Sequence, residues 1–378
     1  MKRGRIGGLT ILLLLMAFGC KEREREEPPA PAEAEPAEAT DGAPQERQPF
    51  TLVATGDVRG EIEPCGCEPP TGGLARRVAY VQKRRAEGPV LVVDAGDALA
   101  ESVRKTDPDR ARLILDAMAA TGVAAAGVGE LDLALGVEWL KEAATKAGVP
   151  YLAANLVDGA GEALFPGRKI VEVGANRIGL FAVLTSGRSL PEGVSLRDAV
   201  EAAAAEVRAL REAGVDLVVG LVHGPVNEVD RVARGSGADV VVPAHMGGNT
   251  EVYQTRGGTW VTYTGHEGRT LLEARFDLRG EGKLVAENVV ERLESRKREL
   301  EGKISVGKQQ LETLTNPAMR EEVRELVERF ERDLERVRED EEELGTPGRK
   351  FRSRFVHLNG KDGEDPTFLE EVRKLASR

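Results

Sequence analysis

Two aspartates and two histidines follow apolar runs in this chain of 378 residues, and their types and positions could support metal chemistry. Asp57 and Asp97 each come after a short run typical of a buried strand, as do His223 and His245. Loops beyond the carboxyl ends of strands are where open α/β sheets place functional side chains. Carboxylates and imidazoles that converge there can hold metal ions, which generate hydroxide and stabilise developing phosphoryl charge. The pattern predicts a metal centre.

A second candidate chemistry lies in the loop after Asp57, where Cys65-Gly66-Cys67 holds two of the chain's three cysteines. A disulfide across one residue closes a small, strained ring, which is the kind that reductants open readily. Gly66 provides the backbone freedom that such a ring needs. Four interpretations remain open: a redox dithiol, replacement metal ligands, a link to another protein, and an inert pair.

Residues 1–20 have the features of a targeting segment. Positive residues precede an apolar stretch at 11–16, and small residues precede Cys20. The segment resembles a bacterial lipoprotein signal peptide with its lipobox cysteine. This resemblance implies that Cys20 is lipidated and anchors the mature protein in a membrane. We therefore expect an extracytoplasmic lipoprotein, in the periplasm or at the cell surface, whose cysteines can oxidise.

The charge of the chain narrows the classes of partner. The net charge is -11 and the pI about 5.2, which argues against nucleic acid because phosphate neutralisation needs a basic surface. Residues 21–49 are rich in proline, alanine and glutamate and have no apolar periodicity. Such a segment cannot bury enough surface to offset its ordering entropy, so we predict a disordered tether.

Residues 50–288 alternate between strand and helix patterns, which predicts an α/β domain with one mixed sheet or two sheets flanked by helices. The predicted helices cover 72–87, 109–121, 137–147, 196–213 and 226–234. The predicted strands cover 51–55, 90–93, 123–126, 151–154, 169–173, 177–184, 215–222, 239–243, 259–264 and 271–277.

The remaining chain has a different pattern. Residues 289–344 are dense in charge and carry apolar side chains at helical spacing, interrupted at Asn316-Pro317, a helix N-cap followed by proline. This predicts a helical hairpin, or a coiled coil with a partner protein or a second copy. Residues 345–378 form a C-terminal segment in which 351–358 is expected to pack back on a domain.

Residues 50–280 resemble the calcineurin-like metallophosphoesterases, and most closely the catalytic domain of bacterial periplasmic 5′-nucleotidases. The resemblance implies a four-layer αββα sandwich with the site on the strand-end loops. The motifs that carry it are Asp57, Gly72-Gly73-Leu74-Ala75-Arg76, Asp94-Ala95-Gly96-Asp97, Gly127-Val128-Gly129-Glu130-Leu131-Asp132, Ala153-Ala154-Asn155-Leu156, Leu221-Val222-His223 and Ala244-His245.

Several positions depart from the family pattern. Arg59 stands where the family has a histidine, Val128 and Gly129 replace its asparagine and catalytic histidine, and Gly247 replaces another histidine. By this resemblance the first metal keeps Asp57 and Asp97 and loses both of its histidines. The second keeps Asp97, His223 and His245 and loses its asparagine. The expected cofactor is one divalent transition metal (Zn, Mn or Fe), or none.

A branch of extracytoplasmic 5′-nucleotidase-like proteins resembles this chain in having a Pro-Cys-Gly-Cys-like loop, with selenocysteine in some members. This favours redox or soft-metal chemistry at Cys65 and Cys67. Our leading hypothesis is therefore an extracytoplasmic lipoprotein with a depleted dimetal site and a redox or soft-metal role, in which Cys65, Cys67 and Arg59 are the reactive residues.

Two alternatives come from other classes. The first is a weak one-metal phosphoesterase acting on nucleotides or other phosphate esters. The second is a non-catalytic protein in which Arg59 holds an anion and residues 289–344 recruit a partner. The predicted partners are the membrane through lipidated Cys20, a protein partner or second copy at 289–344, and a small phosphate-containing ligand.

Overall fold

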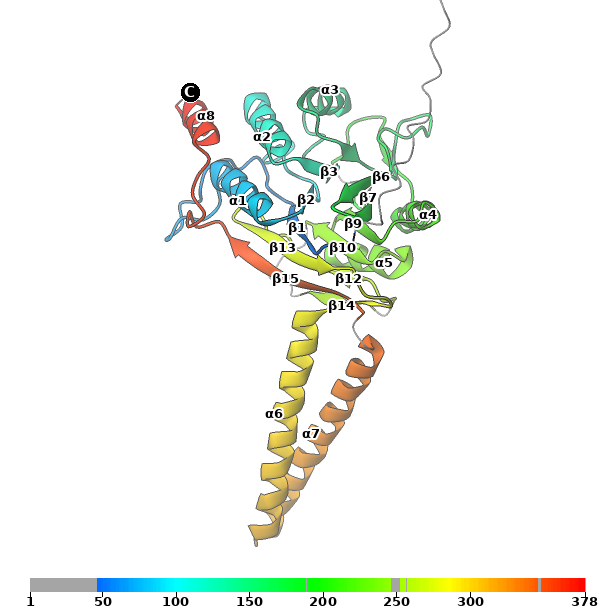
Figure 1. The fold of residues 1–378 in the computed structure, drawn as a ribbon, viewed down its shortest axis with the longest axis vertical. Helices are drawn as coiled ribbons and strands as arrows, with labels where there is room; N and C mark the ends of the chain where they lie inside the picture. The colour runs from blue at the N-terminus through cyan, green and yellow to red at the C-terminus, as the bar shows by residue number, and fades with distance from the viewer. Residues whose placement is uncertain (1–45, 188, 246–251, 256, 346–347, 378) are drawn as a thin grey trace, which may run out of the picture. The chain divides into compact units, whose positions relative to one another are not determined.

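The computed structural model describes residues 46–377 except 188, 246–251, 256 and 346–347 (Figure 1). The predicted signal peptide with Cys20, and nearly all of the predicted tether, lie outside the described residues. Among the helices that the structure describes, none is long and apolar enough to span a membrane.

Two large sheets form the centre of the described domain. The first has seven strands in the order β14-β15-β13-β1-β2-β3-β4 and the second has six in the order β11-β12-β10-β9-β7-β6, while β5 and β8 pair separately. The first sheet contains β1 (Phe50–Thr55), β2 (Val90–Asp94), β3 (Val123–Gly127), β4 (Tyr151–Leu152), β13 (Thr270–Asp277), β14 (Leu284–Ala286) and β15 (Arg349–His357). The second contains β6 (Arg168–Val173), β7 (Asn176–Leu184), β9 (Leu217–His223), β10 (Val240–Ala244), β11 (Tyr253–Gln254) and β12 (Trp260–Val261); the separate pair is β5 (Leu156–Val157) and β8 (Ser195–Leu196).

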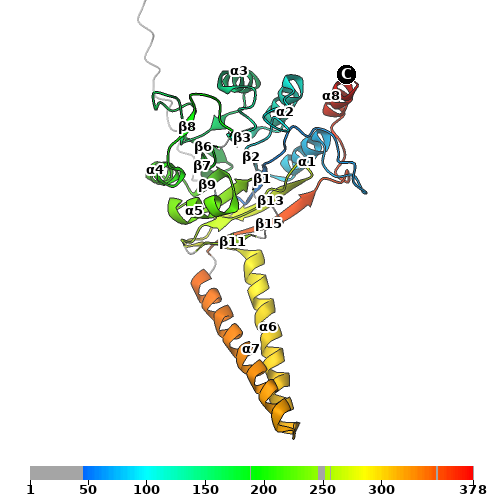
Figure 2. The ribbon, with the colours of Figure 1, turned by 180° about the vertical axis from the view of Figure 1, so that it is seen from behind.

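Helices lie along the outer side of each sheet, as Figures 1 and 2 show. The first sheet is covered by α1 (Leu74–Glu87), α2 (Pro108–Ala120), α3 (Val137–Ala147) and α8 (Pro366–Ala376). The second is covered by α4 (Ala199–Glu212) and α5 (Val226–Ser236). The result is the four-layer αββα sandwich that the resemblance implied.

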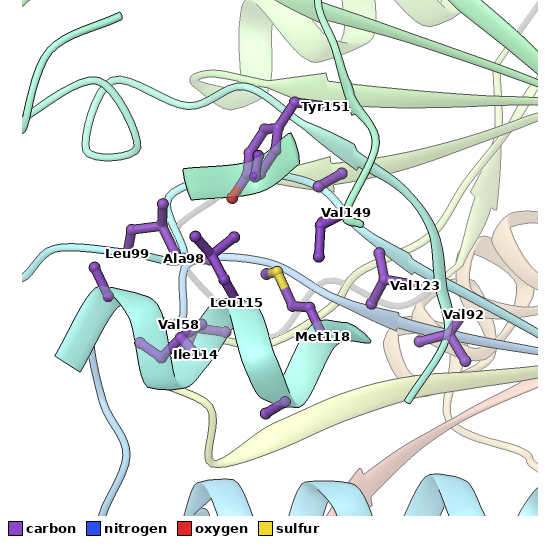
Figure 3. Close-up of a cluster of buried hydrophobic side chains, with 14 of the residues drawn as sticks. Val58, Val92, Ala98, Leu99, Ile114, Leu115, Met118, Val123, Val149 and Tyr151 are labelled. Atoms are coloured by element: carbon purple, nitrogen blue, oxygen red, sulfur yellow. The ribbon is translucent and has the colours of Figure 1, made fainter. Parts of the chain in front are cut away.

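The apolar runs of the sequence are continuous because both faces of the central strands are buried. Side chains alternate between the two faces of a strand. Val53 and Val92 therefore pack under the outer helices, in a cluster of which Figure 3 shows a part that includes Val92. Leu52 and Leu91 point the other way and pack between the two sheets. This alternation buries both faces of the central strands.

The predicted helical hairpin is confirmed by α6 (Glu287–Thr313) and α7 (Pro317–Leu344). The Asn316 side chain accepts hydrogen bonds from two backbone N–H groups of the first turn of α7, which begins with proline. Ion pairs Lys297–Glu341 and Lys308–Glu331 join the two helices in antiparallel order.

The chain then returns to the first sheet. Strand β15 pairs with the whole length of β13 and also with β14, so it lies between those two strands in the first sheet. After β15, α8 begins at an Asp365 cap and lies against α1. Residues 351–358 therefore pack on the domain as predicted, and 351–357 do so as part of a strand within the sheet. The many charged residues of β15 obscured this strand in the sequence.

Candidate metal centre

The candidate site lies where strands of both sheets end. β1 and β2 run parallel, with Thr55 opposite Asp94, so the loops that follow them emerge side by side. β9 and β10 also run parallel, with His223 opposite Ala244. Apolar packing between the sheets brings these two pairs of strand ends together.

The structure brings Asp57, Asp97, His223 and His245 into one cluster, in which one ligand atom of each lies within 4.8 Å of the others. Asp97 is central: its Oδ2 atom lies 3.4 Å from Nε2 of His223 and 4.0 Å from Nδ1 of His245. His245 is exposed, whereas the other three are buried. These are the four metal-ligand candidates of the sequence.

The backbone at this cluster is unusual. Asp57, Asp97 and His245 have φ values of 51°, 58° and 62°. Non-glycine residues rarely adopt this left-handed conformation, and when they do they concentrate at functional sites. The backbone therefore turns sharply at three of the four candidate ligands, aiming their side chains at a common point.

Several buried atoms of the cluster form no hydrogen bond with the described residues. They are Oδ1 of Asp57 and both ring nitrogens of His223, although Nε2 of His223 faces the Asp97 carboxylate at 3.4 Å. Buried polar atoms without a hydrogen bond are rare in folded proteins and call for an explanation such as a bound ion. The donor set of two carboxylates and two imidazoles suits a divalent transition metal.

The charges of the cluster stabilise one another. Burial alone favours the neutral form of Asp97, but the charge of His223 outweighs it and holds the pKa of Asp97 well below its usual value. Burial likewise opposes a charge on His223, yet Asp97 raises the pKa of His223 to about 9. Burial also raises the pKa of Asp57. Without an ion, an imidazolium–carboxylate pair occupies the centre.

The four residues fit one ion. A nitrogen or oxygen ligand lies about 2.0–2.2 Å from such a metal, so two ligands of one ion are at most about 4.4 Å apart. The observed limit of 4.8 Å needs only a small contraction. Asp57, Asp97, His223 and His245 would then complete a four-ligand shell, or three of them would leave one position open.

A second ion does not fit in the same way. Val128, at the family's asparagine position, is buried in the apolar cluster beneath the outer helices. A Cβ atom on Gly129 would lie 2.2 Å from Oδ1 and 2.4 Å from the backbone nitrogen of Asp97. The loop has therefore closed onto Asp97, so the missing histidine has left no vacant space.

Asp132 has a role that the sequence did not reveal, although it stood in the motif after Gly129. It is 1% exposed, and its carboxylate accepts four backbone hydrogen bonds, from Asp97, Gly129, Ala98 and Leu99. In return, the N–H group of Leu131 donates to Oδ1 of Asp97 at 2.7 Å. Asp132 therefore holds the loop that carries the central ligand.

Cys65 and Cys67 lie outside the cluster and are joined to each other in a disulfide. Cys67 is exposed and Cys65 half-buried. The Thr71 N–H group donates to the sulfur of Cys65 at 3.2 Å, and the Thr71 hydroxyl oxygen lies 3.4 Å from that sulfur and 3.6 Å from the sulfur of Cys67. In this oxidised form neither sulfur is free to ligate a metal, which argues against the replacement-ligand interpretation.

Arg59 is half-buried beside the cluster's backbone. Its backbone N–H group donates to the carbonyl oxygen of Asp97 at 2.8 Å. The buried Nε atom of its side chain has no hydrogen-bond partner among the described residues. Its proposed anion contact remains a prediction. Gly247 lies outside the described residues.

Comparison with known proteins identifies relatives by structure. No protein-family model and no curated protein sequence matches this chain. A 5′-nucleotidase precursor from Thermus thermophilus is 26% identical with a TM-score of 0.53, over 62% of this chain and 52% of its own. The sulfate thiohydrolase SoxB of Thermus thermophilus is 19% identical with a TM-score of 0.52, over 60% of this chain and 53% of its own.

A third structure, the NAD nucleotidase of Haemophilus influenzae, is 18% identical with a TM-score of 0.52, over 63% of this chain and 50% of its own. The two matches below 25% identity support the fold alone. This chain spans about half the length of each of the three proteins.

Proposed function

We propose that this chain, whose structure supports membership of the metallophosphoesterase superfamily close to the catalytic domains of 5′-nucleotidases, is a phosphoesterase with a single metal ion. The observation that carries the proposal is the cluster of Asp57, Asp97, His223 and His245, whose ligand atoms lie within 4.8 Å of one another and include buried atoms without a hydrogen bond. The proposed substrates are nucleotides or other phosphate esters.

A divalent ion held there would supply hydroxide at neutral pH and polarise a phosphoryl oxygen. Asp97 and His223 would bind it from buried positions, and Asp132 orients the loop of Asp97. Gly129 offers no acid to protonate the leaving group, a loss that typically lowers rates by about 10²–10⁴-fold. The substrates that suit this site are therefore esters of acidic alcohols and phosphoanhydrides, whose leaving groups depart without a proton.

Metal binding tests this proposal. We expect the purified protein to take up a single zinc or manganese ion and to hydrolyse 4-nitrophenyl phosphate slowly, with activity abolished by chelation and restored by metal. His223→Ala should weaken metal binding by more than about 100-fold, since even loss of a supporting residue costs 10–100-fold. The matched control is His357→Ala, at the exposed end of β15.

The pH dependence of metal binding adds a second readout to the same experiment. A metal ion and a proton compete for His223, whose pKa is about 9 without metal. Affinity should therefore rise with pH up to about 9, by up to about tenfold per unit, with proton release on binding. Hydrolysis that survives chelation, or full metal occupancy in His223→Ala, would contradict the proposal.

A second candidate function is thiol–disulfide exchange at Cys65 and Cys67, favoured by the exposure of Cys67 and by the contacts of Thr71 with both sulfurs. A thiolate of a reducing partner would attack the sulfur of Cys67 and break the disulfide, forming a mixed disulfide. Cys65 would leave as the thiolate, stabilised by the N–H and hydroxyl groups of Thr71.

Thr71→Val tests this second candidate, because it removes the hydroxyl group and keeps the backbone N–H. A hydrogen bond to a charged group contributes about 1.5 kcal/mol, so the pKa of Cys65 should rise by about one unit. Thiolate absorbance measured in a Cys67→Ser background reports that pKa. Thr106→Val, in the loop before α2, is the control. An unchanged pKa, or a disulfide that dithiols do not reduce, would rule out this role.

We also propose that the domain is extracytoplasmic and anchored through a lipid on Cys20. A targeting segment followed by cysteine and a charged tether supports this proposal. Cys20→Ser should move the protein from the membrane fraction to the soluble fraction; retention in the membrane would exclude the lipid anchor.

A further inference from the structure

The hairpin of α6 and α7 has an apolar core that leaves part of its apolar surface uncovered. Leu300, Ile304, Val327, Leu334 and Val337 form that core. Outside it, three large apolar side chains remain exposed: Val306 (55%), Met319 (51%) and Leu326 (38%). An exposed apolar patch on a helical element commonly marks an interaction surface.

A groove runs between the two helices at this patch. Its apolar lining includes Val306 from α6 and Val323, Leu326, Val327 and Phe330 from α7. Gly302 also lines it and has no atom within 4 Å of the place a Cβ would take. A glycine inside a helix costs roughly 1 kcal/mol relative to alanine. Here the missing side chain of Gly302 leaves open space beside Val306, into which an apolar side chain of a partner can fit.

The charges that flank the patch on α7 have opposite signs on its two sides. Glu322 and Glu325 precede Leu326, and Arg329 and Arg332 follow it. All four are exposed and share one face of the helix, because residues three, four and seven apart lie together. Arg332 has a distant ion pair at 4.0 Å with Glu328, and the other three form no ion pair with any residue that the structure describes.

This pattern is complementary to its own reverse. When a second α7 lies antiparallel across Leu326, the acidic turn of each copy meets the basic turn of the other. An anionic lipid surface or a nucleic acid fits poorly, since α7 carries twelve acidic and six basic side chains. The charge order therefore selects a second copy of this chain over those occupants.

We propose that two copies of this chain associate through the apolar groove of the hairpin, with the two α7 helices antiparallel and Leu326 near the two-fold axis. Val306 and Phe330 of each copy then cover the apolar lining of the other. Such an isologous contact closes on itself and yields a dimer rather than a chain of molecules. The interface is independent of the metal centre and of the disulfide.

Charge reversal tests the interface. Light scattering of the full-length protein in mild detergent should show a dimer. Glu322→Arg/Glu325→Arg should weaken self-association on the order of 100-fold, because like charges then face each other. Arg329→Glu/Arg332→Glu should do the same. The two variants mixed with each other should dimerise again, as should a chain that carries all four changes.

A matched control reverses two glutamate charges on another face of α7. Glu335→Arg/Glu339→Arg alters net charge equally on exposed residues, and Glu335 lies about half a turn around the helix from Leu326. This control should remain dimeric. Leu326→Cys should link two chains by a disulfide under oxidation, whereas Glu335→Cys should not. A monomeric native protein, or dimers that neither reversal weakens, would overturn the proposal, as would association only with another protein or a vesicle.

Discussion

Replacing Asp132 by alanine is expected to destabilise the domain by about 4 kcal/mol and to empty the metal centre. The buried carboxylate accepts hydrogen bonds from the backbone N–H groups of Asp97, Gly129, Ala98 and Leu99. Each buried donor left without an acceptor costs about 1–3 kcal/mol, and water entering the cavity would recover part of that. The loss should therefore fall among the largest effects of single substitutions.

Denaturant unfolding measures the free energy of unfolding of this variant, and metal titration measures its affinity for the metal ion. The Asp97 loop would lose the acceptor that fixes it, so metal affinity should fall even where the domain stays folded. Asp132→Asn retains one carbonyl oxygen and should lose less. Asp158 is the matched control, because its half-buried carboxylate accepts backbone N–H bonds from Ala160 and Glu162 in another loop.

Asp158→Ala should cost under about 1 kcal/mol, since water replaces an acceptor at a solvated turn. If Asp132→Ala were no more destabilising than Asp158→Ala, the four-bond network would not be what holds the metal loop. If it unfolded the domain fully, Asp132→Asn would still separate metal affinity from stability.

The fold could be predicted from the sequence because it depends on patterns that extend over many residues. Helix α3 was predicted with its observed bounds, Val137–Ala147, and the apolar side chains at helical spacing in the hairpin include those that form its core. Strand β15 was not predicted, because its charged residues face outward and its partner β13 is distant in sequence. Pairing with a distant strand is not encoded in local periodicity.

The candidate site could be predicted only in part. Its ligands were recognisable because carboxylates and imidazoles stood at strand ends, and the structure brings all four together. The role of Asp132 was not readable, since an aspartate that binds backbone N–H groups looks like any other aspartate in a sequence. The joining of Cys65 to Cys67 was one of several open interpretations, and sequence alone could not choose among them.

Gly129→His restores the residue that the family has at this position, yet it is expected to lower both stability and metal binding without raising hydrolysis. A Cβ atom there would lie 2.2 Å from Oδ1 and 2.4 Å from the backbone nitrogen of Asp97. Neither neighbour can yield easily, because the Asp97 loop is fixed by Asp132. Overpacking of this kind costs about 1–3 kcal/mol.

Gly129→Ala isolates the steric part of that effect, since it adds the Cβ atom alone. It should destabilise the domain by about 2 kcal/mol and weaken metal binding by moving Asp97. Gly159→Ala is the control: there a Cβ atom would meet its nearest neighbour at 3.8 Å, so stability should hardly change. Unfolding midpoints and metal affinities of the three variants test whether the loop at Gly129 has room for a side chain. A Gly129→His protein that is stable and hydrolyses phosphate esters faster would mean that the loop can reopen. The closed backbone around Asp97 would then be a consequence of the missing side chain and would not prevent the two-metal chemistry that the family resemblance implies.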